Sequence, residues 1–421
     1  MLHPVHSHGG HGAVHPQSSG MPDFMDGRIN FDERPILVFW ESTRACLLSC
    51  RHCRAAAIEQ GLPGELSTEE AKRFIDSLKA FGEPAPVLIV TGGDAMMRPD
   101  VFELVAYARE RGMPVGLSPA VTPKLTPESA RAMRDLGVKA ASISLDGARP
   151  ETHENIRGVS DHFPKTLEAL RLLVSLGYTL QVNTTVMRDN MEELAHIAKI
   201  LADVGVKIWE VFFLIQVGRG SEMRELDAQQ HEDVCHFLYD VSRYGIAIRT
   251  VEAPFFRRVC AWRLQDGPEV DPGVKYGLSP LYRRLGGTLV ELMGPPQLPP
   301  AVRSARTRDG KGIIFVGHDG EIYPAGFLPL SLGNIRNASL VDVYRNTPIL
   351  QTIRKAKFTG RCGPCEFADL CGGSRARAYA AFGDPLAEDP ACAYIPPACK
   401  ELPRPVDARL TPDPSTKSPT A

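Results

Sequence analysis

The sequence contains no apolar stretch that approaches the ~20 residues needed to cross a bilayer. Positive and negative charges nearly balance, with a formal net charge of −2 at pH 7. The charge of the chain therefore does not favour binding to nucleic acid or to an anionic membrane. The N-terminal stretch is rich in His and Gly and lacks an apolar core, so it is not an export signal. These absences predict a cytoplasmic protein that acts without a membrane or a nucleic acid.

Six of the ten cysteines fall in two tight groups, and the first group has no fourth member nearby. In a long chain without an export signal, such groups are typical of metal ligands rather than disulfides. Structural zinc sites and most four-iron clusters take four protein ligands. With three thiolates, one iron of a four-iron cluster has no protein ligand and is open to a substrate. The alternatives are a zinc site or cysteines that merely belong to the core. The six residues are Cys46, Cys50, Cys53, Cys362, Cys365 and Cys371.

Short β-rich runs alternate with helical segments between residues 36 and 215. One helical segment, 67–82, begins with Ser67 and Glu70 at the spacing of a capping box. Such repeats give parallel strands with right-handed crossovers, so we expect an α/β fold, either an open sheet or a barrel. Its chemistry should lie at the C-terminal ends of the strands. The predicted strands are 36–43, 87–93, 114–120, 140–147, 179–186 and 208–215.

The spacing C-x3-C-x2-C after the first predicted strand resembles that of the radical S-adenosylmethionine (SAM) superfamily. The resemblance implies a partial (β/α)6 TIM-like barrel and a [4Fe–4S] cluster held by Cys46, Cys50 and Cys53. SAM would chelate the fourth iron. Family members carry a ring before the third cysteine, near the adenine. Here the ring is that of His52. The alternative is that His52 is a loop histidine that faces solvent.

Two further segments resemble SAM-binding motifs of the same superfamily. TGGD at 91–94 resembles the GGE motif that binds the methionine amino group, with an aspartate in place of the usual glutamate. SISLDG and ETHENIRG resemble the pattern of the subfamily with C-terminal iron–sulfur domains, in which a serine faces SAM and an arginine pairs with its carboxylate. Asp146 either belongs to this site or is a turn residue. The implied SAM contacts are Gly92, Gly93, Asp94, Ser144, Arg157, Asn183 and Leu214. The alternatives are that Asn183 hydrogen-bonds the backbone and that Leu214 is a core residue.

The second cysteine group reads C-x2-C-x5-C-x20-C, and its four thiolates would close a zinc or iron–sulfur site completely. The stretch resembles the SPASM or twitch auxiliary-cluster domain. Its form is similar to that of haem-biosynthesis radical SAM decarboxylases, and similar tails occur in peptide maturases. The resemblance implies an auxiliary [4Fe–4S] cluster on Cys362, Cys365, Cys371 and Cys392, with Cys399 as an alternative fourth ligand.

Two departures from this pattern predict a single auxiliary cluster. Ser374 stands where many relatives have a second cysteine of a CGGC motif, and Ala325 stands where many have a cysteine after the hairpin predicted at 313–326. Arg375 and Arg377 flank the cluster. They either pair with the acids of the LAEDP segment or reach a substrate carboxylate.

These observations divide the chain into five predicted parts: a disordered His-rich leader (1–35), a radical SAM barrel (36–250), a bridging segment (251–310), a SPASM/twitch domain (311–398) and a disordered tail (399–421). The predicted activity is reductive cleavage of SAM to a 5′-deoxyadenosyl radical. Its target would be a tetrapyrrole-like small molecule that is oxidised or decarboxylated. A maturase acting on a ribosomal peptide and a non-catalytic zinc or iron–sulfur scaffold are the alternatives. A low-potential donor such as flavodoxin or ferredoxin would supply the electron.

Overall fold

A curved nine-stranded sheet organises the computed structural model, which describes residues 29–267, 269–302 and 306–400. The strand order is β7-β6-β5-β4-β3-β2-β1-β8-β9, and every neighbouring pair is parallel except β8 and β9. The strands are β1 (Leu37–Glu41), β2 (Val87–Thr91), β3 (Val115–Leu117), β4 (Ala140–Ser144), β5 (Thr179–Val186), β6 (Ile208–Phe213), β7 (Ala247–Val251), β8 (Ile313–Val316) and β9 (Ile322–Tyr323).

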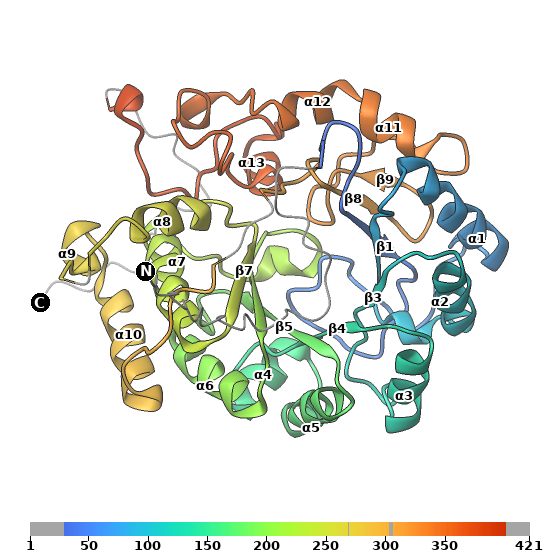
Figure 1. Cartoon of the computed structure of the whole chain (residues 1–421), viewed down its shortest axis with the longest axis horizontal. Coiled ribbons are helices and arrows are strands. Elements are labelled where there is room, and N and C mark those ends of the chain that lie inside the picture. The colour runs from blue at the N-terminus through green and yellow to red at the C-terminus, as the bar shows by residue number, and fades with distance from the viewer. Residues whose placement is uncertain (1–28, 268, 303–305, 401–421) are drawn as a thin grey trace, which may run out of the picture.

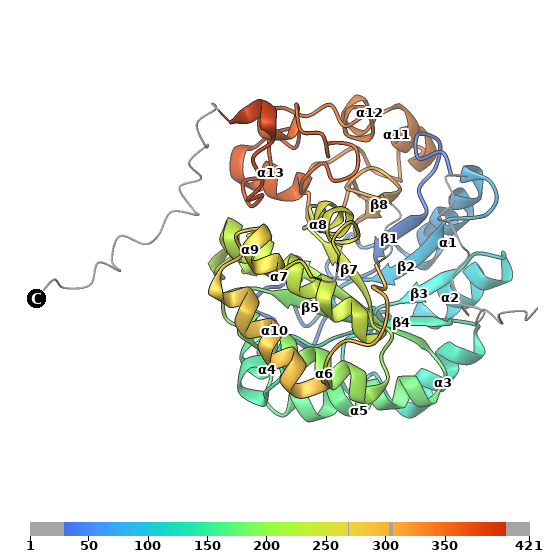
Figure 2. The ribbon, with the colours of Figure 1, turned by 60° about the vertical axis from the view of Figure 1, so that its left-hand side comes forward.

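Helices surround the outer face of this sheet, and the C-terminal segment lies beside β8 and α8 at one end of it (Figures 1 and 2). The first seven helices are α1 (Thr68–Ser77), α2 (Val101–Glu110), α3 (Pro127–Asp135), α4 (Pro150–Arg157), α5 (His162–Ser175), α6 (Leu194–Val204) and α7 (Ala228–Val241). The later ones are α8 (Phe256–Arg263), α9 (Pro272–Lys275), α10 (Pro280–Met293), α11 (Leu340–Asn346), α12 (Pro348–Arg354) and α13 (Arg375–Phe382).

Local sequence explains these elements well. The Ser67–Glu70 capping box is present at the start of α1. Along β5 the residues alternate between half-buried and buried, as expected for a strand with one face on the helices and one on the barrel lumen. On the helix side the indole of Trp209 donates to the Thr184 hydroxyl at 2.8 Å, so its buried N–H is satisfied.

The structure confirms the six predicted parallel strands and adds a seventh, β7, beside β6. The hairpin predicted at 313–326 forms β8 and β9, with Gly320 at a positive φ of 84° in the turn. Because β8 pairs with β1, the C-terminal segment contributes a strand to the barrel sheet. The segment 251–310, predicted as a bridge, contains α8, α9 and α10, and α10 packs against α6 and α7.

The end of the predicted leader is packed against the C-terminal segment. The Tyr344 hydroxyl donates to the Phe31 carbonyl at 2.8 Å, and Arg354 Nε donates to Asp32 at 2.9 Å. Disorder is therefore wrong for these residues, and positions 1–28 of the leader lie outside the described residues. Of the predicted tail, Cys399 is buried in a short 3₁₀ helix, and residues 401–421 are not described. The domain boundaries remain predictions.

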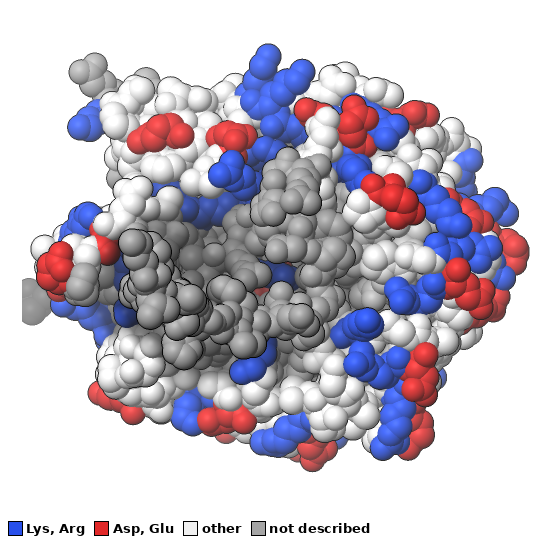
Figure 3. Space-filling view, in the orientation of Figure 1, with Lys and Arg blue, Asp and Glu red and all other residues white. Residues whose placement is uncertain are grey.

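Charges of both signs are interspersed over the described residues on the face that Figure 3 shows. In the part of the chain that the structure describes, no helix is both long and apolar enough to span a bilayer.

Two Glu–Arg pairs allow a direct test of how burial sets the stability of the fold. Glu232 on α7 binds Arg258 on α8 through two hydrogen bonds of 2.8 and 2.6 Å, and both side chains are buried. We predict that Glu232→Ala lowers the free energy of unfolding by about 3–5 kcal/mol, because it leaves the arginine buried without its partner. Equilibrium denaturation measures this loss.

The matched control is Glu192→Ala, which breaks the Glu192–Arg284 pair, whose side chains are 51% and 56% exposed. It should cost about 1 kcal/mol or less. Equal losses for the two variants would contradict the assignment of the buried pair as a link between α7 and α8.

Candidate functional site

The first cysteine group lies on the loop that follows β1, an interior strand between β2 and β8. Cys46 and Cys50 are buried and Cys53 is half-buried. The backbone N–H of Cys46 donates to the Ile58 carbonyl at 2.7 Å, which closes the loop at its base. The three predicted cluster ligands therefore share one compact loop at the C-terminal end of an interior strand, where parallel α/β folds place their chemistry.

The glycines of TGGD bring the end of β2 against this loop. The backbone N–H groups of Gly93 and Asp94 donate to the carbonyls of Thr43 and Ala45, each at 2.7 Å. A Cβ on Gly93 would lie 2.4 Å from the Ala45 carbonyl oxygen, and one on Gly92 would lie 2.5 Å from that of Thr43. Only glycine permits this approach, so both residues set the position of the cysteine loop.

The carboxylate of Asp94 is fully buried and already has several donors. It accepts from the backbone N–H groups of Met96 at 3.0 Å and Ala120 at 3.2 Å, and from the Thr122 hydroxyl at 2.8 Å. Burial raises the pKa of Asp94. The side chain thus ties the end of β2 to the loop after β3, and its contact with a methionine amino group remains a prediction.

Asp146, directly after β4, is the centre of the buried polar network beside the cysteines. Its Oδ2 lies 2.7 Å from Arg157 Nη2 and 2.9 Å from His52 Nε2, and its Oδ1 accepts from the Thr185 N–H at 2.7 Å. Arg157 and His52 hold the pKa of this carboxyl well below its usual range despite complete burial. Asp146 is therefore more than a turn residue, and His52 points to the protein interior rather than to solvent.

Arg157 joins this network to the cysteine loop. Its Nη1 lies 3.5 Å from Cys50 Sγ, while its buried Nε has no acceptor among the described residues. Burial raises the pKa of the Cys46 thiol to about 11 and also raises the pKa of Cys50, against the opposing effect of Arg157. Thiolates here need adjacent positive charge, which the guanidinium provides in part and bound iron would complete. The donor set fits an iron–sulfur cluster.

Within the described residues, no three His, Cys, Asp or Glu side chains come close enough to ligate a single metal ion. Around a four-iron cluster each thiolate binds a different iron, so the cysteines need not converge on one point.

The remaining predicted SAM contacts lie along β4, β5 and the end of β6. Ser144 and Asn183 are register partners on neighbouring strands, and both are half-buried on the lumen face. Asn183 Oδ1 accepts from Gln181 Nε2 at 2.8 Å. Leu214 is buried in a small cluster with Ile156 on α4. The fold brings all three residues to one end of the barrel, while their contacts with SAM remain predictions.

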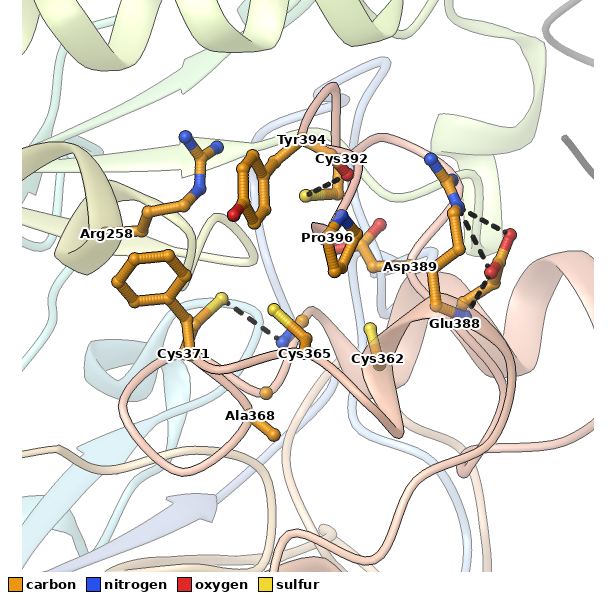
Figure 4. Close-up of a pocket in the computed structure, with 14 residues that line it drawn as sticks. Arg258, Cys362, Cys365, Ala368, Cys371, Glu388, Asp389, Cys392, Tyr394 and Pro396 are labelled. Atoms are coloured by element: carbon orange, nitrogen blue, oxygen red, sulfur yellow. Dashed lines mark hydrogen bonds and ion pairs between the residues drawn. The ribbon is translucent and has the colours of Figure 1, made fainter. Parts of the chain in front are cut away.

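The four cysteines predicted for the auxiliary site line one cavity in the C-terminal segment (Figure 4). Arg258 also lines it, with its guanidinium 5.1 Å from the centre of the Tyr394 ring. Cys399 is not among the lining residues, which favours Cys392 as the fourth ligand. The cysteines are Cys362, Cys365, Cys371 and Cys392.

Ser374, where many relatives carry a cysteine, has a different role here. It caps α13, and its hydroxyl bonds to buried Glu252 at 2.5 Å. Arg377 Nη1 donates to the Glu252 carbonyl at 2.8 Å and lies 3.4 Å from Asp389 in the LAEDP segment. Arg375 donates to the backbone carbonyls of Gly373, Pro385 and Ala387. Both arginines are buried, so acid pairing is the correct interpretation for Arg377 and neither reaches an open substrate site.

Comparison with known proteins matches residues 40–201 to the radical SAM superfamily. The chain is 36% identical to the AdoMet-dependent heme synthase of Nitratidesulfovibrio vulgaris over 91% of this chain and 98% of that protein. It is 35% identical to the protein of the same name from Methanosarcina barkeri, over 87% and 99% of the two chains.

Among solved structures, SuiB of Streptococcus suis bound to S-adenosylmethionine aligns with a TM-score of 0.63. The alignment covers 86% of this chain and 78% of SuiB at 13% identity, so it shows the shared fold alone. The superfamily match and the likeness to these relatives over nearly their whole length point to the same family as the cysteine spacing of the loop after β1. This chain therefore belongs to the radical SAM superfamily, as an enzyme related to the AdoMet-dependent heme synthases.

Proposed function

We propose that this enzyme oxidatively decarboxylates propionate side chains of an iron tetrapyrrole, as an AdoMet-dependent heme synthase. The observation that carries the proposal is the likeness to proteins of that name over nearly their whole length, at 36% and 35% identity. Coproporphyrin carries propionates at positions where haem carries vinyl groups. Iron coproporphyrin III is therefore the substrate that we test.

In this proposal the cysteine loop holds a [4Fe–4S] cluster through Cys46, Cys50 and Cys53, which together with SAM supplies a 5′-deoxyadenosyl radical when bound. Gly92 and Gly93 let the backbone approach the methionine portion of SAM. The remaining contacts are those predicted from sequence: Asp94 for the amino group, Arg157 for the carboxylate, Ser144 for the ribose or the methionine portion, Asn183 for the ribose, and His52 and Leu214 for the adenine.

The proposed reaction of the substrate has two steps. A hydrogen atom passes from the carbon β to the propionate carboxylate to the 5′-deoxyadenosyl radical, which would become 5′-deoxyadenosine. The resulting carbon radical loses CO2 and one electron, and a vinyl group remains. The barrel's contribution is to orient the side chain and exclude water, since a solvent-exposed radical would be quenched.

We propose that Cys362, Cys365, Cys371 and Cys392 hold an auxiliary [4Fe–4S] cluster that accepts this electron. Their placement around one cavity supports four-thiolate ligation. It would lie in a C-terminal domain (311–398) joined to the barrel (36–250) by the segment 251–310. A low-potential flavodoxin or ferredoxin would deliver the electron for SAM cleavage, and a reducing cytoplasm would keep the thiols free.

The proposed function is tested by incubating the anaerobically reconstituted enzyme with SAM, dithionite and iron coproporphyrin III. Chromatography with mass detection should show successive loss of two propionate carboxyl groups and formation of haem. Cleavage of SAM with the porphyrin unchanged would contradict the proposed substrate and favour a peptide substrate.

We predict that Cys50→Ala abolishes SAM cleavage and removes about half of the iron. The substitution removes one of three cysteine ligands of the cluster, together with the contact of that cysteine with Arg157. Iron is counted per chain and 5′-deoxyadenosine is measured after reduction. Cys260→Ala, which changes a half-buried cysteine of α8 outside both groups, should retain iron and cleavage. Wild-type cleavage by Cys50→Ala would contradict the assignment of the catalytic cluster.

Removal of the auxiliary site should separate SAM cleavage from turnover. For Cys365→Ala we expect about half of the iron to be lost, continued formation of 5′-deoxyadenosine, and no haem product, since the electron from the product radical has no acceptor. Iron content and product formation are measured on the same preparation. Unchanged iron content would refute the second cluster.

A further inference from the structure

An arginine that follows β6, Arg219, binds both ends of the part of the cysteine loop that runs from residue 50 to 57. It lies in the short 3₁₀ helix Gly218–Glu222. Its Nε donates to the Cys50 carbonyl at 2.9 Å, and its Nη1 donates to the Ala57 carbonyl at 2.8 Å. Its backbone N–H donates to the Cys53 carbonyl at 3.0 Å. A single residue after β6 therefore fixes the backbone of two predicted cluster ligands.

The glycines on either side of Arg219 permit this close approach. Gly218 has a positive φ of 57°, and a Cβ on it would overlap the carbonyl oxygen of Arg54. A Cβ on Gly220 would lie 3.3 Å from the carbonyl oxygen of His52. The backbone before and after Arg219 thus packs directly against the cysteine loop, and a side chain at Gly218 would push the two apart.

The part of the loop that Arg219 binds has a strained backbone. Ala56 has a φ of 46°, in the left-handed region that residues other than glycine rarely adopt. Such a conformation persists only where the surrounding contacts determine it. The guanidinium of Arg44 donates to the Ala55 carbonyl, and that of Arg219 donates to the Ala57 carbonyl. Two guanidinium groups therefore hold the chain on both sides of Ala56.

Arg219 also differs in its charge balance from Arg157, the other arginine beside Cys50. Arg157 lies 2.7 Å from the carboxylate of Asp146, which largely neutralises its charge. Among the residues that the structure describes, both side-chain hydrogen bonds of Arg219 go to backbone carbonyls, and no carboxylate pairs with it. Its buried Nη2 has no acceptor there. The guanidinium therefore places an unpaired positive charge beside the predicted cluster ligands.

We propose that Arg219 is a positioning residue for the [4Fe–4S] cluster of the cysteine loop (the first cluster), and that its charge raises the reduction potential of this cluster. The inference rests on the cluster of the proposed function and goes beyond it, because it names a residue that controls entry of the electron. The first cluster takes one electron from the flavodoxin or ferredoxin before SAM is cleaved. Three thiolates already make the site negative, so a nearby positive charge favours the reduced state.

The experiment measures two properties of the anaerobically reconstituted enzyme other than its activity. The first is the reduction potential of the first cluster, from a redox titration followed by electron paramagnetic resonance. The signal that changes when SAM is added identifies this cluster. The second is the rate at which a chelator removes iron from it. The variants are Arg219→Gln, which removes the charge, and Arg219→Lys, which keeps the charge but lacks the planar fork of donors.

For Arg219→Gln we expect about a tenfold lower ratio of reduced to oxidised cluster at a given applied potential, which equals a shift of about 59 mV to lower potential. Iron should leave about 10-fold faster, as for the loss of other groups that hold metal ligands in place. Arg219→Lys should keep the wild-type potential and lose iron as quickly as Arg219→Gln. A folded Arg219→Gln chain that takes up only about half of the iron would also support the positioning role.

The matched control is Arg34→Gln. Arg34 precedes β1, at the end of that strand opposite to the cysteine loop, and its side chain likewise donates to a backbone carbonyl, that of Glu83 at 2.7 Å. This variant should keep the potential and the iron release of the wild type. Thermal unfolding establishes that each variant is folded.

A wild-type potential and wild-type iron release in Arg219→Gln, or the same losses in Arg34→Gln, would overturn the inference and leave the proposed function intact. Equal lowering of the potential by Arg219→Gln and Arg219→Lys would overturn the role of the charge. A wild-type enzyme without a signal that responds to SAM would instead overturn the proposed cluster, and the inference with it.

Discussion

The buried carboxylate of Asp146, after β4, connects three elements at the predicted catalytic end of the barrel: the cysteine loop, α4 and β5. It holds His52 of the cysteine loop at 2.9 Å, Arg157 of α4 at 2.7 Å and the backbone of β5 through Thr185. Through Arg157 it also reaches Cys50. A fully buried charge is tolerated only with such partners. The fold therefore positions the cysteine loop by electrostatics from β4 as well as by the close approach of Gly92 and Gly93.

A second set of buried charges connects the barrel to the C-terminal segment. Arg377 of α13 contacts the Glu252 carbonyl after β7, and Arg258 of α8 lies between Glu232 and the auxiliary cavity. Together with the pairing of β8 and β1, these contacts give the two predicted cluster sites fixed positions in one molecule. Such a fixed arrangement suits electron transfer from a substrate radical in the lumen to an auxiliary cluster.

The sequence alone predicted the six parallel strands and the two cysteine groups, because short-range periodicity and cysteine spacing carry that information. It did not show α10, whose sequence contains Gly286 and Gly287 and lies in a segment rich in proline. Nor did it show the interactions of Asp146 and Glu210. Their partners are distant in sequence, and only the sheet register brings them together.

The central claim is that a radical from SAM takes hydrogen from a propionate side chain held in this lumen. The most direct measurement uses iron coproporphyrin III with deuterium on the carbons β to the carboxylates. The account predicts that deuterium appears in 5′-deoxyadenosine and that the labelled side chains become vinyl groups. Formation of unlabelled 5′-deoxyadenosine, with the porphyrin recovered intact, would contradict it.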